Sequence, residues 1–225
     1  NNPDSPTVIV NAGAISPLVT LLSSGATEAK DSAKTALQML ALNNPSNQLA
    51  IATGLVTLLG TGSAAAQGHV THLLLTLASD ATNRIAIAKA GAIPRLISQL
   101  RPSGEKGASA QQFARVQELA AAVLANLSGD SDANVAAIRN ASGIVPLIKL
   151  LASPSAQAQA HAAAVLSDLT RRSAESQADV AREGGVEPLV RLLSTAVTAE
   201  AKAEAAGALW SLSSGDEDTK AAVAD

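Results

Sequence analysis

Paired histidines and a glycine-rich stretch are the features of this chain whose spacing could support chemistry. His69 and His72 are three positions apart, so a helix would place both imidazoles on one face as metal ligands. The sequence offers no third ligand nearby, since His161 is far along the chain. Residues 60–68 have the glycine content of a dinucleotide loop, but such a loop must follow a strand. We therefore expect no metal, no nucleotide and no other cofactor.

Composition argues against several further classes of protein. The chain has no Cys, which excludes disulfides, thiolate zinc sites and a cysteine nucleophile. Its net charge of −3 provides no basic field for nucleic acid. No apolar run approaches the roughly 18 residues that a membrane span needs, and no Ser/His/Asp set suggests a catalytic triad. We expect a non-catalytic protein with no nucleic-acid partner and no integral membrane segment.

The elements that position these residues are predicted to be helices. Hydrophobic residues make up 47% of the chain, whereas aromatic residues make up only 1%, which is too few for a typical sheet protein. Ala and Leu supply most of the apolar content, and both favour helices.

The helices are predicted to repeat in units of about 42 residues. An apolar pair, a spacer and a second apolar position recur in five blocks, which begin at Leu18, Leu55, Leu96, Leu147 and Leu189. After each block, small or apolar residues recur at offsets 0, 3, 4 and 7, as on one face of a helix. Glycine and then proline precede four of the blocks, which predicts a sharp turn between a first and a second helix, with the glycine in the left-handed conformation. Each unit therefore has two short helices and a longer third helix.

Two units depart from this pattern. The second unit lacks the Gly-to-Pro stretch, so we expect its first two helices to be truncated or fused. The third unit has about nine extra residues after Leu100. We expect residues 101–112 to be a mobile loop. Phe113 then lies in this insert or at the start of a lengthened third helix, and packs the insert down.

The pattern resembles the armadillo repeat, whose unit has three helices in about 42 residues. The third unit is the most similar, with Asn83 to Pro94 reading NRIAIAKAGAIP and Ala122 to Leu127 reading AVLANL. The resemblance implies an all-α, right-handed α-solenoid (superhelix), with a single domain over residues 1–225. The predicted repeats are 1–43, 44–80, 81–130, 131–173 and 174–218, and 219–225 would begin a sixth. Two-helix HEAT repeats are the structural alternative.

The resemblance also implies a concave groove, lined by third helices, that binds an extended peptide. In the family's nuclear-import adaptors, a ladder of Asn side chains holds the ligand backbone and Trp side chains clamp basic residues. The Asn positions here hold Met39, Thr76, Asn126, Asp168 and Ser211. The Trp positions hold Thr35, His72, Ala122, Ala164 and Gly207. Only Asn126 matches, so import-signal binding is not predicted.

The candidate groove residues form a mixed polar stripe on the predicted third helices. They are His72, Thr76, Asn126, Asp130, Asp168, Arg172, Trp210 and Ser211. We expect the ladder positions to face outward, either as groove residues or as solvated polar residues near helix ends. Two interpretations of Trp210, the single Trp, stay open: a core residue, or an exposed anchor for a partner.

These observations predict a scaffold that holds an extended peptide or a helix of another protein. The alternative function is a substrate-recognition or accessory domain of a larger enzyme, such as a U-box ubiquitin ligase, whose armadillo half this chain resembles in style. Both ends look uncapped, so end-to-end self-association is a further expectation. We expect a cytoplasmic or nuclear location.

Overall fold

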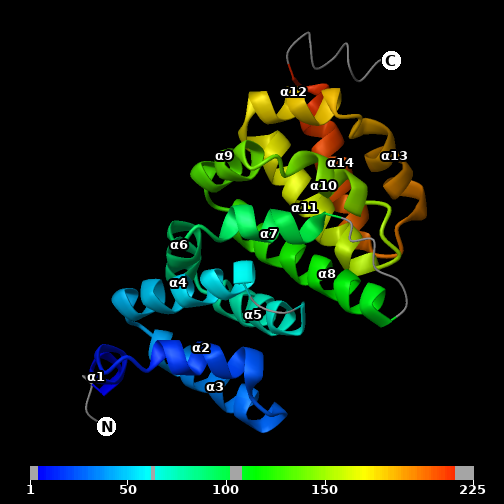
Figure 1. Cartoon of the computed structure of the whole chain (residues 1–225). Helices are drawn as coiled ribbons and strands as arrows, with labels where there is room; N and C mark the ends of the chain where they lie inside the picture. The colour runs from blue at the N-terminus through cyan, green and yellow to red at the C-terminus, as the bar shows by residue number, and fades with distance from the viewer. Residues whose placement is uncertain (1–4, 62–63, 102–107, 216–225) are drawn as a thin grey trace. The chain divides into compact units, whose positions relative to one another are not determined.

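The computed structural model describes residues 5–61, 64–101 and 108–215. Over these ranges the chain forms fourteen α-helices and no strand (Figure 1). The first seven are α1 (Ser5–Asn11), α2 (Ile15–Ser24), α3 (Thr27–Ala41), α4 (Pro45–Thr61), α5 (Ala64–Leu77), α6 (Ala81–Lys89) and α7 (Ala92–Leu100). The others are α8 (Ala108–Ser128), α9 (Asp132–Asn140), α10 (Ile144–Leu150), α11 (Ala156–Arg172), α12 (Ala174–Arg182), α13 (Val186–Thr195) and α14 (Ala199–Ser213). The predicted all-helical class is confirmed.

The chain divides into two compact units. Unit 1 comprises Asn1–Arg95 and Glu105–Val116, and unit 2 comprises Leu96–Gly104 and Gln117–Asp225. The boundary passes through α7 and α8 rather than through a loop between helices. The single-domain organisation over residues 1–225 and the five repeat boundaries remain predictions.

Unit 1 contains the region where the repeat pattern is compressed. Helix α2 packs against α3, α4 and α5, and α4 packs against α5 and α6. Residues 45–61, where the other units have two helices and a turn, form the single helix α4. The expectation of fused helices is confirmed, because without the Gly-to-Pro stretch nothing in this segment breaks the helix.

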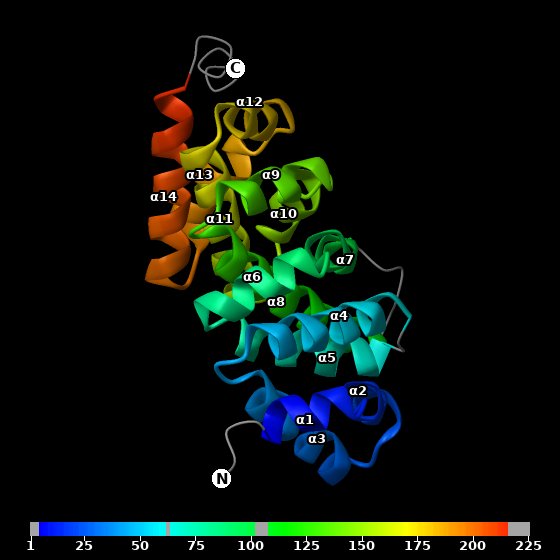
Figure 2. The ribbon, with the colours of Figure 1, turned by 90° about the vertical axis from the view of Figure 1, so that its left-hand side faces the viewer.

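Unit 2 repeats a group of three helices twice, as α9–α11 and α12–α14. In each group the longer helix comes last, and the two long helices α11 and α14 lie side by side (Figure 2). Amide side chains connect the start of each group to the end of the preceding long helix. Asn134 Nδ2 donates to the carbonyl of Leu127 at 2.8 Å, and Gln177 Nε2 donates to the carbonyl of Thr170 at 2.7 Å. These bonds satisfy carbonyls that a helix end leaves without a partner.

The turns between first and second helices have the left-handed backbone that the sequence predicts, with one difference. Gly13, Gly91 and Gly184 have φ values of 85°, 79° and 72°. In the turn at 142–143, however, Ser142 adopts the left-handed conformation with φ of 58°. Gly143 is instead required by close packing, because a Cβ atom there would lie 2.9 Å from Ile97 Cδ1. The prediction that glycine itself is left-handed is wrong at this turn.

The core is formed by the apolar positions that recur on the third helices. Of the twenty positions at offsets 0, 3, 4 and 7, all but Ala36 and Leu209 are buried. Burying one leucine side chain contributes roughly 1.5–3 kcal/mol, so regular spacing of this kind stabilises every unit of the stack.

The insert of the third unit lengthens a helix. Residues 102–107 lie outside the described residues, but residues 108–112 form the first part of α8. A loop over the whole of 101–112 is therefore wrong for that part, and Phe113 lies half-buried near the start of a lengthened third helix. The predicted start of a sixth repeat at 219–225 also lies outside the described residues.

One finding bears on membranes. In the described part of the chain, no single helix has both the length and the apolar character needed to cross a bilayer. Helices α1 and α2 meet the same criterion only when taken together, and they are bent by 75° relative to each other.

Candidate functional site

The long helices α8, α11 and α14 contribute neighbouring surfaces in unit 2. Two hydrogen bonds join α8 to the start and the end of α11. Ser155 Oγ donates to Glu118 Oε2 at 2.7 Å, and Ser128 Oγ donates to Asp168 Oδ2 at 2.8 Å. On the other flank of α11, a Cβ atom on Gly207 of α14 would lie 3.2 Å from Ser167 Oγ. The three helices therefore present a continuous strip of side chains, which we name the third-helix surface of unit 2.

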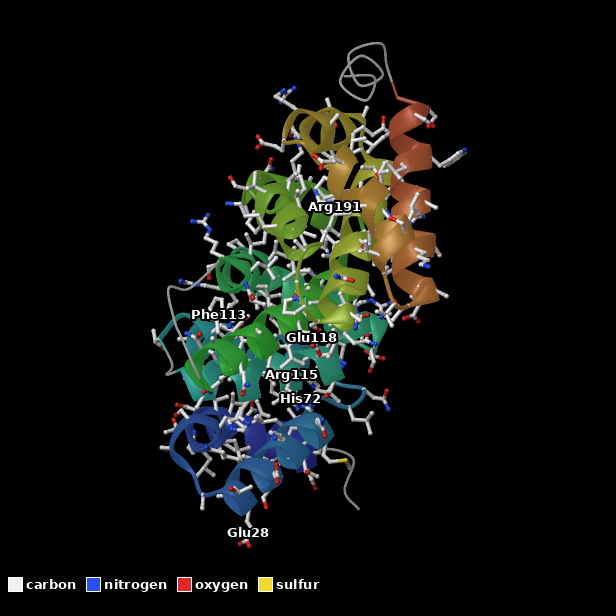
Figure 3. The ribbon with its side chains drawn as sticks, turned by 90° about the vertical axis from the view of Figure 1, so that its right-hand side faces the viewer. Glu28, His72, Phe113, Arg115, Glu118 and Arg191 are labelled. Atoms are coloured by element: carbon white, nitrogen blue, oxygen red, sulfur yellow. The ribbon has the colours of Figure 1, made fainter. Side chains whose placement is uncertain are left out.

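One end of the third-helix surface is carboxylate-rich. Glu118 projects from α8 (Figure 3), His161 lies on α11 and Glu200 lies in the first turn of α14. The negative charges of Glu118 and Glu200 favour the protonated form of the His161 imidazole and thereby act to raise its pKa. Partial burial acts more strongly in the opposite direction and lowers the pKa of His161 below its ordinary value. Because His161 is neutral and none of the described cations pairs with Glu200, the carboxylate of Glu200 gives this end negative character.

The opposite end is held by ion pairs within unit 2. Arg171 pairs with Asp168, and Arg172 Nη1 lies 2.8 Å from Asp132 Oδ1. Arg172 also donates to the carbonyl of Gly129, at the end of α8. Asp168 and Arg172, both predicted groove residues, therefore have partners inside the protein. Both side chains join helices, so few of their polar atoms remain available to a ligand.

Asn126 and Asp130 lie at this same end and are exposed, as the predicted groove requires. Asn126 is on α8, and its amide can both donate and accept a hydrogen bond. It is the single residue of the third-helix surface that combines the armadillo ladder position with exposure to solvent.

Trp210 and Ser211 are neighbours in sequence on α14, but their environments differ. Ser211 is 3% exposed and donates to the carbonyl of Gly207 at 3.1 Å, so the expectation that it faces outward is wrong. Trp210 is 69% exposed, which excludes the core interpretation of this residue. Packing explains the difference, because the turn of α14 near Gly207 approaches α11 whereas the indole projects away from the core.

The predicted residues His72 and Thr76 belong to unit 1, where both are exposed on α5. Thr76 donates its hydroxyl proton to the carbonyl of His72 at 3.1 Å, along their own helix. Nearby His69 is half-buried, and burial together with Lys30 and Lys34 lowers its pKa. The structure thus assigns the eight predicted residues to two units, and the six in unit 2 do not all face one way.

The metal site and the dinucleotide loop that the sequence analysis considered can be compared with the structure. No cluster of three or more His, Cys, Asp or Glu side chains suited to a metal is present in the part of the chain that the structure describes. Gly60 lies within helix α4 rather than after a strand, so the local context of a dinucleotide loop is not met.

Glu118, His161 and Glu200 are surface residues that the sequence motif did not select. The ladder and clamp positions of the resemblance fall one turn or more away from them. The clamp positions themselves hold the small residues Ala122, Ala164 and Gly207. The available signal was their spacing from the clamp positions, since Glu118 lies four positions before Ala122, His161 three before Ala164 and Glu200 seven before Gly207, which places each near the helix face of its clamp position.

Comparison with known proteins identifies a family whose model matches two parts of the chain. The family model described as Armadillo/beta-catenin-like repeat matches residues 131–171 and 173–214. These spans correspond to the helix groups α9–α11 and α12–α14. None of the curated proteins matches the chain.

Several solved structures are similar over almost the whole chain. An engineered protein from a structural genomics programme is 32% identical with a TM-score of 0.75, covering 99% of this chain and 54% of its own. This chain thus spans about half of that protein. A second engineered protein from the same programme is 29% identical, with a TM-score of 0.69, and covers 99% of this chain and 85% of its own.

A designed armadillo repeat protein, crystallised in complex with the peptide (KR)4, is 21% identical with a TM-score of 0.73. It covers 93% of this chain and 86% of its own length. At this identity the likeness concerns the fold, which is an armadillo-type α-solenoid.

Proposed function

Because this chain belongs to the armadillo repeat family, we propose that it is a non-catalytic scaffold that binds an extended segment of a partner protein. The segment lies across α8, α11 and α14, on the third-helix surface of unit 2. The observation that carries this proposal is the side-by-side arrangement of these helices, with an exposed Asn126 at one end and the carboxylates of Glu118 and Glu200 at the other.

The charge of the surface favours a partner segment with basic side chains. Both arginines on the third-helix surface are already paired with carboxylates of unit 2, whereas none of the described cations pairs with Glu200. Lys or Arg side chains of a ligand would therefore meet uncompensated negative charge near Glu200. A designed protein of the same fold binds (KR)4, which supports this choice of ligand.

Asn126 is suited to hold the ligand backbone. A peptide bond presents one donor and one acceptor, and a carboxamide can complement both. The small residues Ala122, Ala164 and Gly207 leave no aromatic clamp, so specificity should be modest and should depend on charge. This distinguishes the proposed site from an import-signal site with paired Trp clamps.

The test is a titration of the chain with fluorescein-labelled (KR)4, followed by fluorescence anisotropy. Replacing Glu118 and Glu200 together with Gln should weaken binding by roughly five- to twentyfold, because exposed ion pairs contribute about 0.2–1 kcal/mol each and more when they act together. The Glu118→Gln change keeps a side-chain oxygen that can accept the hydrogen bond from the Ser155 hydroxyl. Asn126→Ala should weaken binding by roughly fivefold, as one net hydrogen bond predicts.

The matched control is Glu183→Gln, which removes an exposed carboxylate from the end of α12, away from the third-helix surface. This variant should bind (KR)4 like the parent chain. An equal loss in the control would mean that only overall net charge matters. Unchanged affinity of the Glu118/Glu200 double variant would overturn the assigned surface.

A further inference from the structure

His161 lies on the part of α11 that a ligand can reach. From residue 160 to residue 170, all of α11 is buried except His161, Ala164 and Asp168. Residues three, four and seven positions apart share one face of a helix, so these three form a single line on the third-helix surface of unit 2. A segment that binds across this surface therefore crosses that line.

His161 is the one residue of this line whose polar atoms are not already engaged. Ala164 has only a methyl group, and Asp168 is bound to Ser128 and Arg171. In the part of the chain that the structure describes, no hydrogen bond joins the His161 ring to another residue. A change in the charge of this ring therefore breaks no hydrogen bond of the fold.

The helices on either side of α11 each bring a carboxylate toward His161. Glu118 of α8, labelled in Figure 3, accepts a hydrogen bond from the Ser155 hydroxyl at 2.7 Å. The same hydroxyl accepts from the backbone N–H of Ala158 at 3.2 Å, which holds it at the start of α11. Glu200 lies in the first turn of α14, and α14 packs along α11. We name Glu118, His161 and Glu200 the Glu–His–Glu cluster.

Other charged groups on the helices packed against α11 leave the pKa of His161 unaffected. Those on α8, α10 and α14 are Arg115, Lys149, Lys202 and Glu204. The charged residues of α9 and α12 lie toward the opposite end of α11, where Asp132 pairs with Arg172. Titration of the ring is therefore governed by its burial and by the two carboxylates of the cluster.

A proton and a basic ligand compete for this cluster. Protonation of His161 adds one positive charge beside Glu118 and Glu200, which weakens their attraction for Lys and Arg side chains. Partial burial holds the pKa of the ring below its ordinary value, so the ring is neutral near neutral pH and takes up its proton on acidification. A bound basic segment should in turn make the ring harder to protonate, because such coupling is reciprocal.

We propose that His161 is the pH sensor of the third-helix surface of unit 2, and that protonation of its ring weakens the binding of a basic segment. This inference rests on the proposed function, because it concerns the same surface and the same class of ligand. The chain accordingly holds a basic segment more tightly at neutral pH than in an acidic medium.

The test is the affinity for (KR)4 between about pH 7.5 and about pH 5, the interval in which histidines titrate, at constant ionic strength. The peptide carries a rhodamine label, because fluorescein itself titrates in this interval. The Kd of the parent chain should rise roughly two- to fivefold on acidification, which is the effect of one exposed charge. His161→Gln should lose most of this dependence, because an amide stays neutral throughout.

A second measurement follows the ring directly, by NMR titration of the parent chain. It gives the pKa of His161 without ligand and with saturating (KR)4. The bound peptide should lower this pKa, by about one pH unit for each tenfold change in affinity, because the two effects must be equal. An unchanged pKa would overturn the proposal. This readout needs no variant, so it decides the matter even if His161→Gln folds poorly.

His69→Gln is the matched control. His69 is also half-buried with a lowered pKa, but it lies on α5 of unit 1 and contributes nothing to the third-helix surface of unit 2. This variant should keep the pH dependence of the parent chain. An equally flat response in His69→Gln would mean that the overall charge of the chain governs binding, which would overturn the role of His161.

Failure of this inference can be told apart from failure of the proposed function. If (KR)4 binds at neutral pH and its Kd is the same after acidification, the sensor is overturned and the peptide surface stands. The same conclusion follows if His161→Gln keeps the full pH dependence. If (KR)4 does not bind at any pH, both proposals are overturned.

Discussion

The Ser128 hydroxyl donates a hydrogen bond to Oδ2 of Asp168 at 2.8 Å and thereby joins α8 to α11 in unit 2. Asp168 also pairs with Arg171, and its side chain is only 13% exposed. A residue that the sequence places in a binding groove therefore has a structural role. The two aspartates of the predicted stripe, Asp130 and Asp168, should consequently respond differently to mutation.

Asp168→Ala should destabilise the chain by about 1–3 kcal/mol, because it removes hydrogen bonds to a charged acceptor and leaves Ser128 without this partner. Urea unfolding followed by circular dichroism measures the change. Glu183→Ala, at an exposed position directly after α12, should stay within about 0.5 kcal/mol of the parent chain. Equal stability of the Asp168 variant and the parent would contradict the structural role of this carboxylate.

Two Gly-to-Ala substitutions should have opposite effects on stability. A Cβ atom on Gly185 would lie 2.7 Å from Val180 Cγ1 and 2.9 Å from the carbonyl oxygen of Val180. Gly185→Ala should therefore cost about 1–3 kcal/mol through overpacking. Gly68 lies inside α5, and its nearest neighbour, Val116 Cγ2, would be 3.6 Å away. Gly68→Ala should stabilise by roughly 0.5–1 kcal/mol, as helix propensity predicts.

Thermal unfolding of both variants beside the parent chain gives the comparison. If both variants melted lower than the parent, helix propensity would not govern position 68. If neither changed, the close approach at Gly185 would carry no energetic weight.

Stability should decrease on acidification through His161. Its pKa is lowered in the folded chain, chiefly by burial, so the unfolded chain binds the proton more readily. The contribution is fully present above about pH 6.5, the ordinary value for histidine, and is lost as pH falls through the lower folded value. Urea midpoints between about pH 8 and pH 5 measure this slope.

His161→Gln is the variant that isolates this effect. Its stability should vary less with pH over the same interval, because the titrating group has been removed. A matched control is Asn126→Gln, which changes an exposed side chain on α8 that does not titrate and should keep the slope of the parent chain. An identical slope in the parent and in His161→Gln would show that burial of this imidazole does not govern the pH response.

Much of the fold could be predicted from local patterns. The offsets of 0, 3, 4 and 7 identified the buried face of each third helix, and the missing Gly-to-Pro stretch identified α4 as a fused helix. Both are properties of short segments: a helix buries its apolar stripe, and a chain without a breaker continues as helix. The turn at 142–143 departs from this, because Ser142 has the left-handed conformation there, while Gly143 is required by its close packing against Ile97.

The candidate site was less predictable, because the exposure of a polar residue depends on the neighbouring helix. The sequence by itself determined that this is a repeated helical chain with polar positions along its long helices. Only the tertiary structure decided that Ser211 is buried while the adjacent Trp210 is exposed, and that Asp168 and Arg172 join helices. Residues next to each other on a helix point about 100° apart, so packing against α11 on one side is enough to separate them.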